Sequence, residues 1–188
     1  PGKKLYRMGI GDVSLPLCDA VIKALHEAVD DQAKADKFHG YMPECGAPFL
    51  RNAISEYYGK RDVKLSPDEI FVSSGASDEL GDILDLFDRG NTSLVIEPAY
   101  PAYVDANVMG GRKVIHIESS ADNGFIPAPD KSVKSDIIYI CSPNNPTGTM
   151  IPSDELEKIA KVIVENQIWC ISDEIYCELV YEDSKHIS

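Results

Sequence analysis

Long hydrophobic runs are missing from this 188-residue sequence. No stretch approaches the ~20 consecutive apolar residues that a membrane-spanning helix requires, so we expect no membrane-spanning segment. The first four residues, PGKK, are not followed by the apolar core of a signal peptide either. Because the sequence does not begin with methionine, we expect the natural protein to begin further upstream.

Positive charge is scarce. The chain has 18 Lys and Arg residues against 31 Asp and Glu residues, which gives a net charge of -13. The basic residues are scattered and form no basic stripe. A chain with this balance repels nucleic acids and anionic membrane surfaces, so we expect neither as a partner.

Cysteines are few, and their spacing matches no metal-binding motif. The five cysteines are odd in number, and no two of them form a CxxC pair, which argues against a disulfide framework and against a zinc site. Cys141 and Cys170 lie in apolar runs, where a thiol behaves as a small hydrophobic group. We therefore expect no metal and a reducing, cytoplasmic location.

Helical and strand-like patterns alternate along the whole chain. Apolar spacing predicts helices over residues 21–29, 49–58, 80–87, 101–109 and 156–163. Short apolar runs predict strands over residues 70–73, 94–96, 113–117, 136–141 and 168–172. Apolar strands between amphipathic helices indicate an α/β fold, with a mainly parallel sheet between two helical layers (αβα). With no repeat and no linker, we expect one domain over residues 1–188.

Ligands of such sheets bind beyond the carboxyl ends of the strands, and two informative segments follow the strands that end near 73 and 96. In SSGASDE (73–79), small residues let backbone N–H groups approach a phosphate at a helix N-terminus. The same residues also suit a plain helix cap, with Ser77 as the capping residue. In EPAYPAY (97–103), Tyr100 can stack on a planar cofactor or simply pack against the next helix.

Two further segments follow the later strands. In SPNNPTGT (142–149), the prolines fix the backbone and Gly148 permits a tight turn, so Asn145 can donate a hydrogen bond at a defined point. In SDEIY (172–176), the Asp173 carboxylate can hold a protonated ring nitrogen, and Tyr176 can reach a ring oxygen. Taken alone, Asp173 suits the role of a helix cap equally well.

In this order, the four segments resemble the large domain of class I/II (fold-type I) aminotransferases, which depend on pyridoxal phosphate (PLP). The most specific match is SPNNPTG (142–148), followed by Asp173-x-x-Tyr176. The resemblance covers essentially the whole chain. It implies PLP as the cofactor, an amino acid and a 2-oxo acid as substrates, and a PLP-dependent transferase large domain that is incomplete.

The resemblance also implies a role for each matching residue. Gly75, Ala76 and Ser77 would hold the PLP phosphate, and Tyr100 would stack on the pyridine ring. Asn145 and Tyr176 would bind the phenolic oxygen of the ring. Asp173 would act as the catalytic carboxylate that pairs with the protonated ring nitrogen.

Two residues near the N-terminus match family positions as well. Tyr41, in the segment HGY (39–41), matches the tyrosine that reaches the phosphate in the partner subunit. Gly11, in the segment GIGD (9–12), matches a backbone position that lines the substrate pocket. The resemblance therefore implies a homodimer whose active sites lie at the subunit interface.

Three stretches resemble LL-diaminopimelate aminotransferases in particular: residues 7–17, 100–105 and 140–145. Those enzymes transfer an amino group from glutamate to tetrahydrodipicolinate in lysine biosynthesis. Two features depart from that subfamily. Ser77 stands where a lysine is usual, and residues 172–176 look more like aspartate- or alanine-type aminotransferases.

The lysine that forms the Schiff base with PLP does not match any residue of this chain. Lys185 lies only 12 positions beyond Asp173, in a polar tail, and is interpreted as solvated. The N-terminal arm, and the C-terminal small domain that supplies the substrate-binding arginine, are also absent. We therefore expect a fragment of a longer chain, inactive by itself.

Three other functions remain as alternatives. A PLP-dependent carbon–sulfur lyase or decarboxylase would share the same cofactor-binding residues, because reaction type is set elsewhere. A nucleotide-binding module is opposed by the lack of GxGxxG and GxxxxGK[ST] motifs. A non-catalytic α/β domain is opposed by the presence of Asn145, Asp173 and Tyr176.

Overall fold

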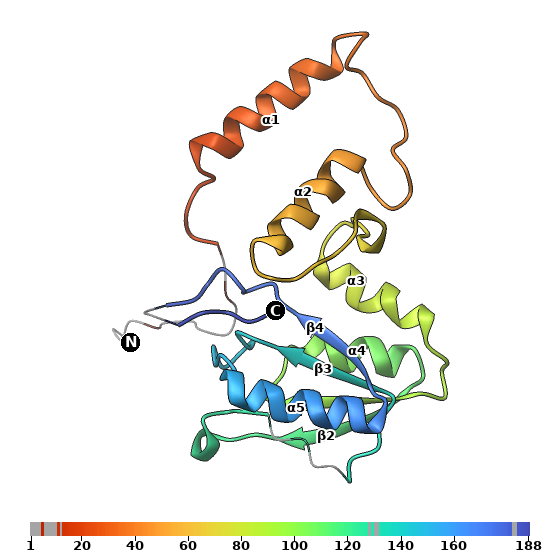
Figure 1. Ribbon diagram of the computed structural model, residues 1–188, viewed down its shortest axis with the longest axis vertical. Helices are drawn as coiled ribbons and strands as arrows, with labels where there is room; N and C mark the ends of the chain where they lie inside the picture. Colours follow the sequence, from red (N-terminus) through yellow and green to blue (C-terminus); the bar gives the residue numbers. More distant parts are fainter. Residues whose placement is uncertain (1–4, 6–10, 12, 128, 130–131, 182–183) are drawn as a thin grey trace. The chain divides into compact units, whose positions relative to one another are not determined.

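The computed structural model describes residues 5, 11, 13–127, 129, 132–181 and 184–188 (Figure 1). The chain divides into two compact units, Pro1–Glu44 and Cys45–Ser188. That both belong to one domain stays a prediction. In the part of the chain that the structure describes, no helix is long and apolar enough to cross a membrane.

The N-terminal unit is built around one long helix, α1 (Asp19–Gln32). It contains the helix predicted over residues 21–29, which is confirmed. At its C-terminal end, the Asp31 carboxylate accepts hydrogen bonds from Lys34 and Lys37. The large apolar side chains of α1 are exposed: Val21, Ile22, Leu25 and Val29.

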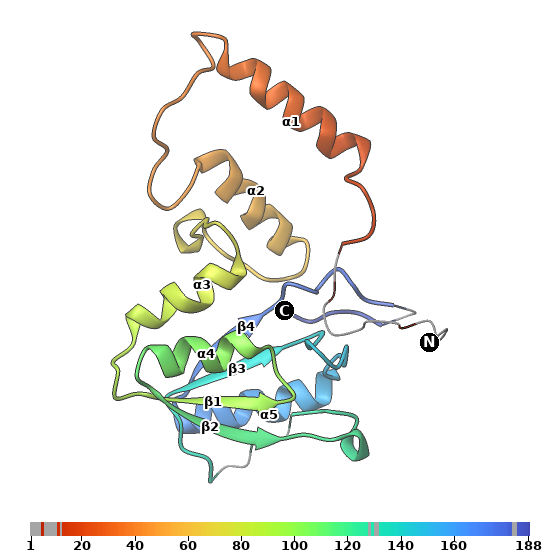
Figure 2. The ribbon, with the colours of Figure 1, turned by 180° about the vertical axis from the view of Figure 1, so that it is seen from behind.

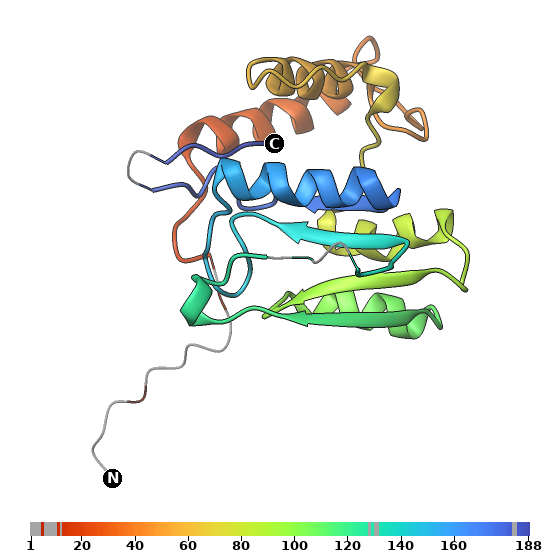
Figure 3. The same cartoon turned by 60° about the horizontal axis from the view of Figure 1, so that its bottom comes forward.

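The second unit contains a four-stranded sheet with the order β2-β1-β3-β4. Its strands are β1 (Thr92–Glu97), β2 (Lys113–Glu118), β3 (Ile137–Cys141) and β4 (Trp169–Asp173). All of the neighbouring strands pair in parallel, and they run side by side in Figure 3. The predicted parallel sheet is therefore confirmed.

The strand order reverses between β1 and β3. From β1 the chain crosses to β2 on one side, and from β3 it crosses to β4 on the other side. In open α/β sheets, such a switch point leaves a crevice outside the carboxyl ends of the two central strands. Residues that follow β1 and β3 are thus placed where ligands bind in this class of fold.

Helices cover both faces of the sheet. Helix α5 (Ser153–Asn166) lies in front of the sheet in Figure 1 and behind it in Figure 2, whereas α4 (Pro101–Met109) lies on the opposite face. The remaining helical elements of this unit are α2 (Pro48–Gly59), η1 (Pro67–Glu69), α3 (Ala76–Asp82), η2 (Ile83–Leu86) and η3 (Ala121–Asn123). The predicted three-layer αβα architecture is confirmed.

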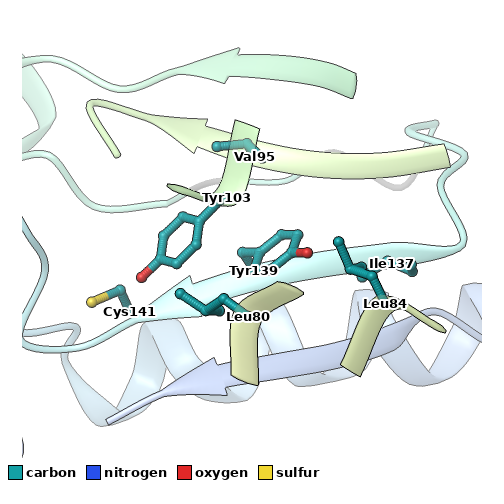
Figure 4. Packing of buried hydrophobic residues seen from close by; sticks show 7 residues of the cluster. All are labelled: Leu80, Leu84, Val95, Tyr103, Ile137, Tyr139 and Cys141. Carbon is teal, nitrogen blue, oxygen red and sulfur yellow. The ribbon is translucent and has the colours of Figure 1, made fainter. Parts of the chain in front are cut away.

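The core has two layers because the side chains of β3 alternate between the faces of the sheet. Ile137, Tyr139 and Cys141 pack with α3, η2 and α4, as Figure 4 shows. Ile138 and Ile140 pack against α5 on the other face. All five residues of β3 are buried, so this strand is the centre of the unit.

One predicted strand is wrong. Residues 70–73 form no strand in the part of the chain that the structure describes. The N–H of Val72 donates to the carbonyl of Cys45, 3.0 Å away, but no strand ladder follows. Apolar, β-branched residues favour a strand only when a neighbouring strand supplies the pairing.

The helix predicted over residues 80–87 is present, but only its first part is α-helical. It begins earlier, at Ala76, and continues from α3 into the 3-10 turn η2. The buried Arg112 donates hydrogen bonds to the carbonyls of Leu84 and Phe87. The Leu84 carbonyl also accepts the N–H of Phe87, so Arg112 adds a second bond there and fixes the end of η2.

Replacing Ile138 by alanine should lower the free energy of unfolding by about 2–5 kcal/mol, because it leaves a cavity in the centre of the core. Chemical denaturation of the full-length protein measures this change. Val164→Ala on the exposed face of α5 is the control, with an expected change within about 0.5 kcal/mol. Equal effects of the two substitutions would contradict the assignment of Ile138 to the core.

Candidate functional site

Six of the residues predicted to bind the cofactor line one pocket of about 120 Å³. The pocket lies at the carboxyl edge of the sheet, and its wall is formed by Ala76, Ser77, Leu80, Tyr100, Asn145, Asp173, Ile175 and Tyr176. It shares residues with two more open hollows, of about 260 and 760 Å³. The segments that follow β1, β3 and β4 therefore meet as the sequence predicts.

The segment that begins α3 forms one wall of the pocket. Gly75 precedes the helix with φ 145° and ψ 161°, a conformation that only glycine adopts without strain. Ser77 is not the helix cap, because it lies inside α3. Its hydroxyl lies 3.1 Å from the hydroxyl of Tyr100 instead, so the capping interpretation of Ser77 is wrong.

Tyr100 is the residue at which the loop after β1 turns into α4. Its ring packs edge-to-face against the ring of Tyr103, with 5.8 Å between ring centroids. Its hydroxyl is held by Ser77. The ring is therefore held by two contacts where it lines the pocket, and an aromatic ring there offers a face on which a planar group can stack.

The loop that carries Asn145 is tied to the loop that carries Tyr100. The side-chain amide of Asn144 donates to the Pro98 carbonyl (3.1 Å) and to the Thr147 hydroxyl (2.9 Å). The backbone of Asn144 also pairs with Gly148 and Thr149, and Gly148 has φ 71°. Sequence reasoning missed this role of Asn144, although the residue lies within the SPNNPTG segment.

Asp173 ends β4, and both of its carboxylate oxygens accept hydrogen bonds. Oδ1 accepts from the Ile175 N–H at 3.1 Å, and Oδ2 accepts from the Tyr103 hydroxyl at 2.6 Å. Asp173 thus holds the turn after β4, but it caps no helix in the described chain. Tyr103 was not predicted; its position three residues after Tyr100, on the same helical face, is the signal that points to it.

Tyr176 lies in the turn after β4 and lines two of the hollows together with Asn145. These two side chains therefore face the same space from different strands of the sheet. A phenol and a carboxamide that converge in this way can both donate a hydrogen bond to one ligand oxygen.

The structure does not test the remaining two predicted residues. Tyr41 and Gly11 lie in the N-terminal unit, where Tyr41 is fully exposed. Their assigned roles stay predictions. Lys185, interpreted as solvated, is exposed and lines none of the hollows described here.

No group of three or more His, Cys, Asp and Glu side chains is arranged to hold a metal ion among the residues that the structure describes. Within the same residues, the lining of the 120 Å³ pocket includes no lysine, arginine or histidine. The side chains available for polar recognition in this pocket are therefore hydroxyl groups, one carboxamide and one carboxylate.

The family profile of "Aminotransferase class I and II" matches residues 3–188. The chain belongs to this family. Pyridoxal phosphate is the cofactor of the family, and the described residues fit it. An aromatic ring, a carboxamide, a phenol and a carboxylate converge on one pocket beside Gly75, whose position leaves open space where a Cβ would lie.

Two curated relatives are LL-diaminopimelate aminotransferases. The chain is 44% identical over 188 residues to the protein of Parabacteroides distasonis, covering 94% of this chain and 46% of the relative. It is 47% identical over 170 residues to the protein of Agathobacter rectalis, covering 84% and 42%. The chain therefore spans about half the length of the curated relatives it matches.

Two solved structures of this family are similar in fold. The aromatic aminotransferase from Pyrococcus horikoshii OT3 gives a TM-score of 0.88 at 30% identity, covering 96% of this chain and 49% of that chain. The aspartate aminotransferase from Thermus thermophilus with maleate gives a TM-score of 0.76 at 28% identity, covering 88% and 45%. Both agree with an incomplete αβα large domain.

Replacing Asn144 by alanine should weaken PLP binding and lower the free energy of unfolding by about 1–3 kcal/mol, because the Pro98 carbonyl loses a part-buried partner. Equilibrium dialysis and chemical denaturation of the full-length protein measure the two effects. The control is Asn166→Ala, which removes a side-chain bond to the Val162 carbonyl in α5, away from the pocket. It should change stability only; the same loss of affinity in both variants would refute a specific role for Asn144.

Proposed function

We propose that the full-length protein containing this chain is an LL-diaminopimelate aminotransferase. It would transfer an amino group between glutamate and tetrahydrodipicolinate, with 2-oxoglutarate and LL-diaminopimelate as the other partners of the reaction. The observation that carries the proposal is the convergence of Ala76, Ser77, Tyr100, Asn145, Asp173 and Tyr176 on one pocket. The names of the curated relatives support the substrate.

Each residue of the pocket has a defined task in this proposal. When bound, PLP supplies an electron sink for the carbanion formed at the substrate carbon. Gly75, Ala76 and Ser77 hold the phosphate, and Tyr100 covers one face of the ring. Asp173 accepts the hydrogen bond of the protonated ring nitrogen and keeps that proton in place.

Asn145 and Tyr176 complete the recognition of the ring by donating hydrogen bonds to its phenolic oxygen. Both side chains face the pocket, so they fix the rotation of the ring in its plane. Holding the reacting groups in one orientation contributes to the rate because it removes rotational freedom before the chemical step.

Several parts of the active site belong, in this proposal, to the rest of the protein. The lysine that moves the proton and the arginine that binds the substrate α-carboxylate lie in the remaining half of the chain. Tyr41 binds the cofactor phosphate of the partner subunit in a homodimer, and Gly11 lines the substrate pocket. The protein is cytoplasmic, and residues 1–188 alone are inactive.

An aspartate- or alanine-type aminotransferase is the second candidate. Ser77 stands where LL-diaminopimelate enzymes usually have lysine, and residues 172–176 resemble the aspartate and alanine types. A carbon–sulfur lyase and a non-catalytic domain are not favoured, because the relatives and structures described above are all named aminotransferases.

The first test is the visible absorbance of the full-length protein with PLP, recorded before and after the addition of glutamate. We expect a PLP band that glutamate removes, and that 2-oxoglutarate restores. LL-diaminopimelate should also remove the band, whereas aspartate and alanine should not. A response to aspartate or alanine alone would favour the second candidate, and a protein that takes up no PLP would exclude both.

Asp173→Asn should slow transamination by about 10²–10³-fold, the range typical of removing one group that stabilises charge in the transition state. Steady-state kinetics with glutamate measure the change. The matched control is Asp154→Asn, at the exposed N-terminal turn of α5, which should keep nearly full activity. Comparable activity of the two variants would remove Asp173 from the mechanism.

A further inference from the structure

A buried polar network lies within the apolar layer between α4 and the sheet. Asn107 is fully buried and has three hydrogen-bond partners. Its side chain accepts a hydrogen bond from the Ser93 hydroxyl (2.6 Å) and donates to the Tyr103 carbonyl (2.7 Å) and to the Tyr139 hydroxyl (2.9 Å). Asn107 thereby ties α4 to β1 and β3 at the position of Tyr103.

The rings of Tyr103 and Tyr139 are stacked, with 4.9 Å between centroids and 17° between planes. Both side chains are almost completely buried. Figure 4 shows that their hydroxyl groups point in opposite directions. The hydroxyl of Tyr139 meets Asn107 inside the core, whereas the hydroxyl of Tyr103 donates to the Asp173 carboxylate at the edge of the pocket.

Tyr103 is a fixed hydrogen-bond donor. Burial, together with the bond to the Asp173 carboxylate, raises the pKa of Tyr103 above its ordinary value. The phenol therefore keeps its proton at neutral pH. Its O–H···O⁻ distance of 2.6 Å is in the range of charge-assisted hydrogen bonds, which are stronger than neutral ones.

Tyr103 matters as a donor to Asp173 because of the side chains that surround this carboxylate. The ionisable side chains that interact with it or line the same hollows are Tyr103 from α4, Cys141 from β3, Tyr176 and Glu174 from the following turn, Glu79 from α3 and Tyr58 from α2. Burial raises the pKa of Cys141, so this thiol is neutral. None of the described residues that line the pocket is a cation.

We propose that Tyr103 is a positioning residue that holds the Asp173 carboxylate in place at the ring-nitrogen end of the cofactor pocket. The inference rests on the proposed function for the identity of the cofactor. The Tyr103 hydroxyl occupies one lone-pair position on Oδ2 and the Ile175 N–H occupies one on Oδ1, so the remaining positions would be open to the ring N–H. The stacked ring of Tyr139 supports the ring of Tyr103 in this position.

The stacked pair supplies its own matched control. Tyr103→Phe and Tyr139→Phe each remove one buried hydroxyl from the same pair of rings and leave the ring volume unchanged. Only Tyr103→Phe removes a donor from Asp173. A purely structural role predicts similar effects of both substitutions, and the proposed role predicts different ones.

The first measurement is the carboxyl-carbon NMR signal of Asp173 in the full-length protein without cofactor at neutral pH. It is recorded with carboxyl-labelled aspartate, and Asp173→Asn assigns the signal. The carboxylate loses a hydrogen-bond donor in Tyr103→Phe, so its signal should move in that variant. It should stay in place in Tyr139→Phe. An unmoved signal in Tyr103→Phe, or equal shifts in both variants, overturns the proposal.

The second measurement is the affinity for pyridoxamine phosphate relative to an analogue with carbon in place of the ring nitrogen. Wild type and Tyr139→Phe should prefer the nitrogen-containing ligand to the same extent. Tyr103→Phe should lose about tenfold of this preference, the size expected for one hydrogen bond to a charged group. An identical preference in all three proteins counts against Tyr103.

The two measurements separate this inference from the proposed function. The NMR measurement requires neither cofactor nor activity, so a signal change confined to Tyr103→Phe supports the positioning role even in a protein that does not respond to glutamate. Conversely, a protein that transaminates but shows no difference between the two variants keeps the proposed function and refutes the role of Tyr103.

Discussion

The arrangement of the site depends on the burial of β3 from both faces. Ile137, Tyr139 and Cys141 are packed from one side, and Ile138 and Ile140 from the other. A strand that is held in this way cannot slip by one residue without placing every side chain on the wrong face. Its register with β4 therefore sets the distance between the loop of Asn145 and the carboxylate of Asp173.

Much of this organisation was predictable from the sequence, because it follows from periodicity and order. Continuous apolar runs predicted four of the strands, and the carboxyl-end rule for parallel sheets placed Tyr100, Asn145 and Asp173 close together. The run at residues 70–73 failed for a physical reason. A strand needs a neighbouring strand, and the only bond in the described chain that ties this segment to a distant one is the bond between Val72 and Cys45; its other bonds, from Ile70 to Pro67 and from Gly75 to Ser73, are local.

The residues that the sequence did not reveal are those that act through a contact with another residue. Asn144, Tyr103 and Asn107 have no distinctive chemistry of their own, and their roles appear only in the distances to Pro98, Asp173 and Tyr139. Such contacts join segments far apart in the chain, so no local pattern reports them. The roles of Tyr41 and Gly11 were inferred from resemblance and still await a test of that kind.

The pocket residues also follow an order along the chain that has a consequence for biosynthesis. The residues from Gly75 to Tyr176 leave the ribosome before any residue beyond Ser188, and domains generally fold from the N-terminus during synthesis. Because domains fold as units, the parts of the pocket cannot meet until β4 has been synthesised. The segment at Gly75 therefore waits for roughly 5–20 s of synthesis before Asp173 and Tyr176 exist to face it.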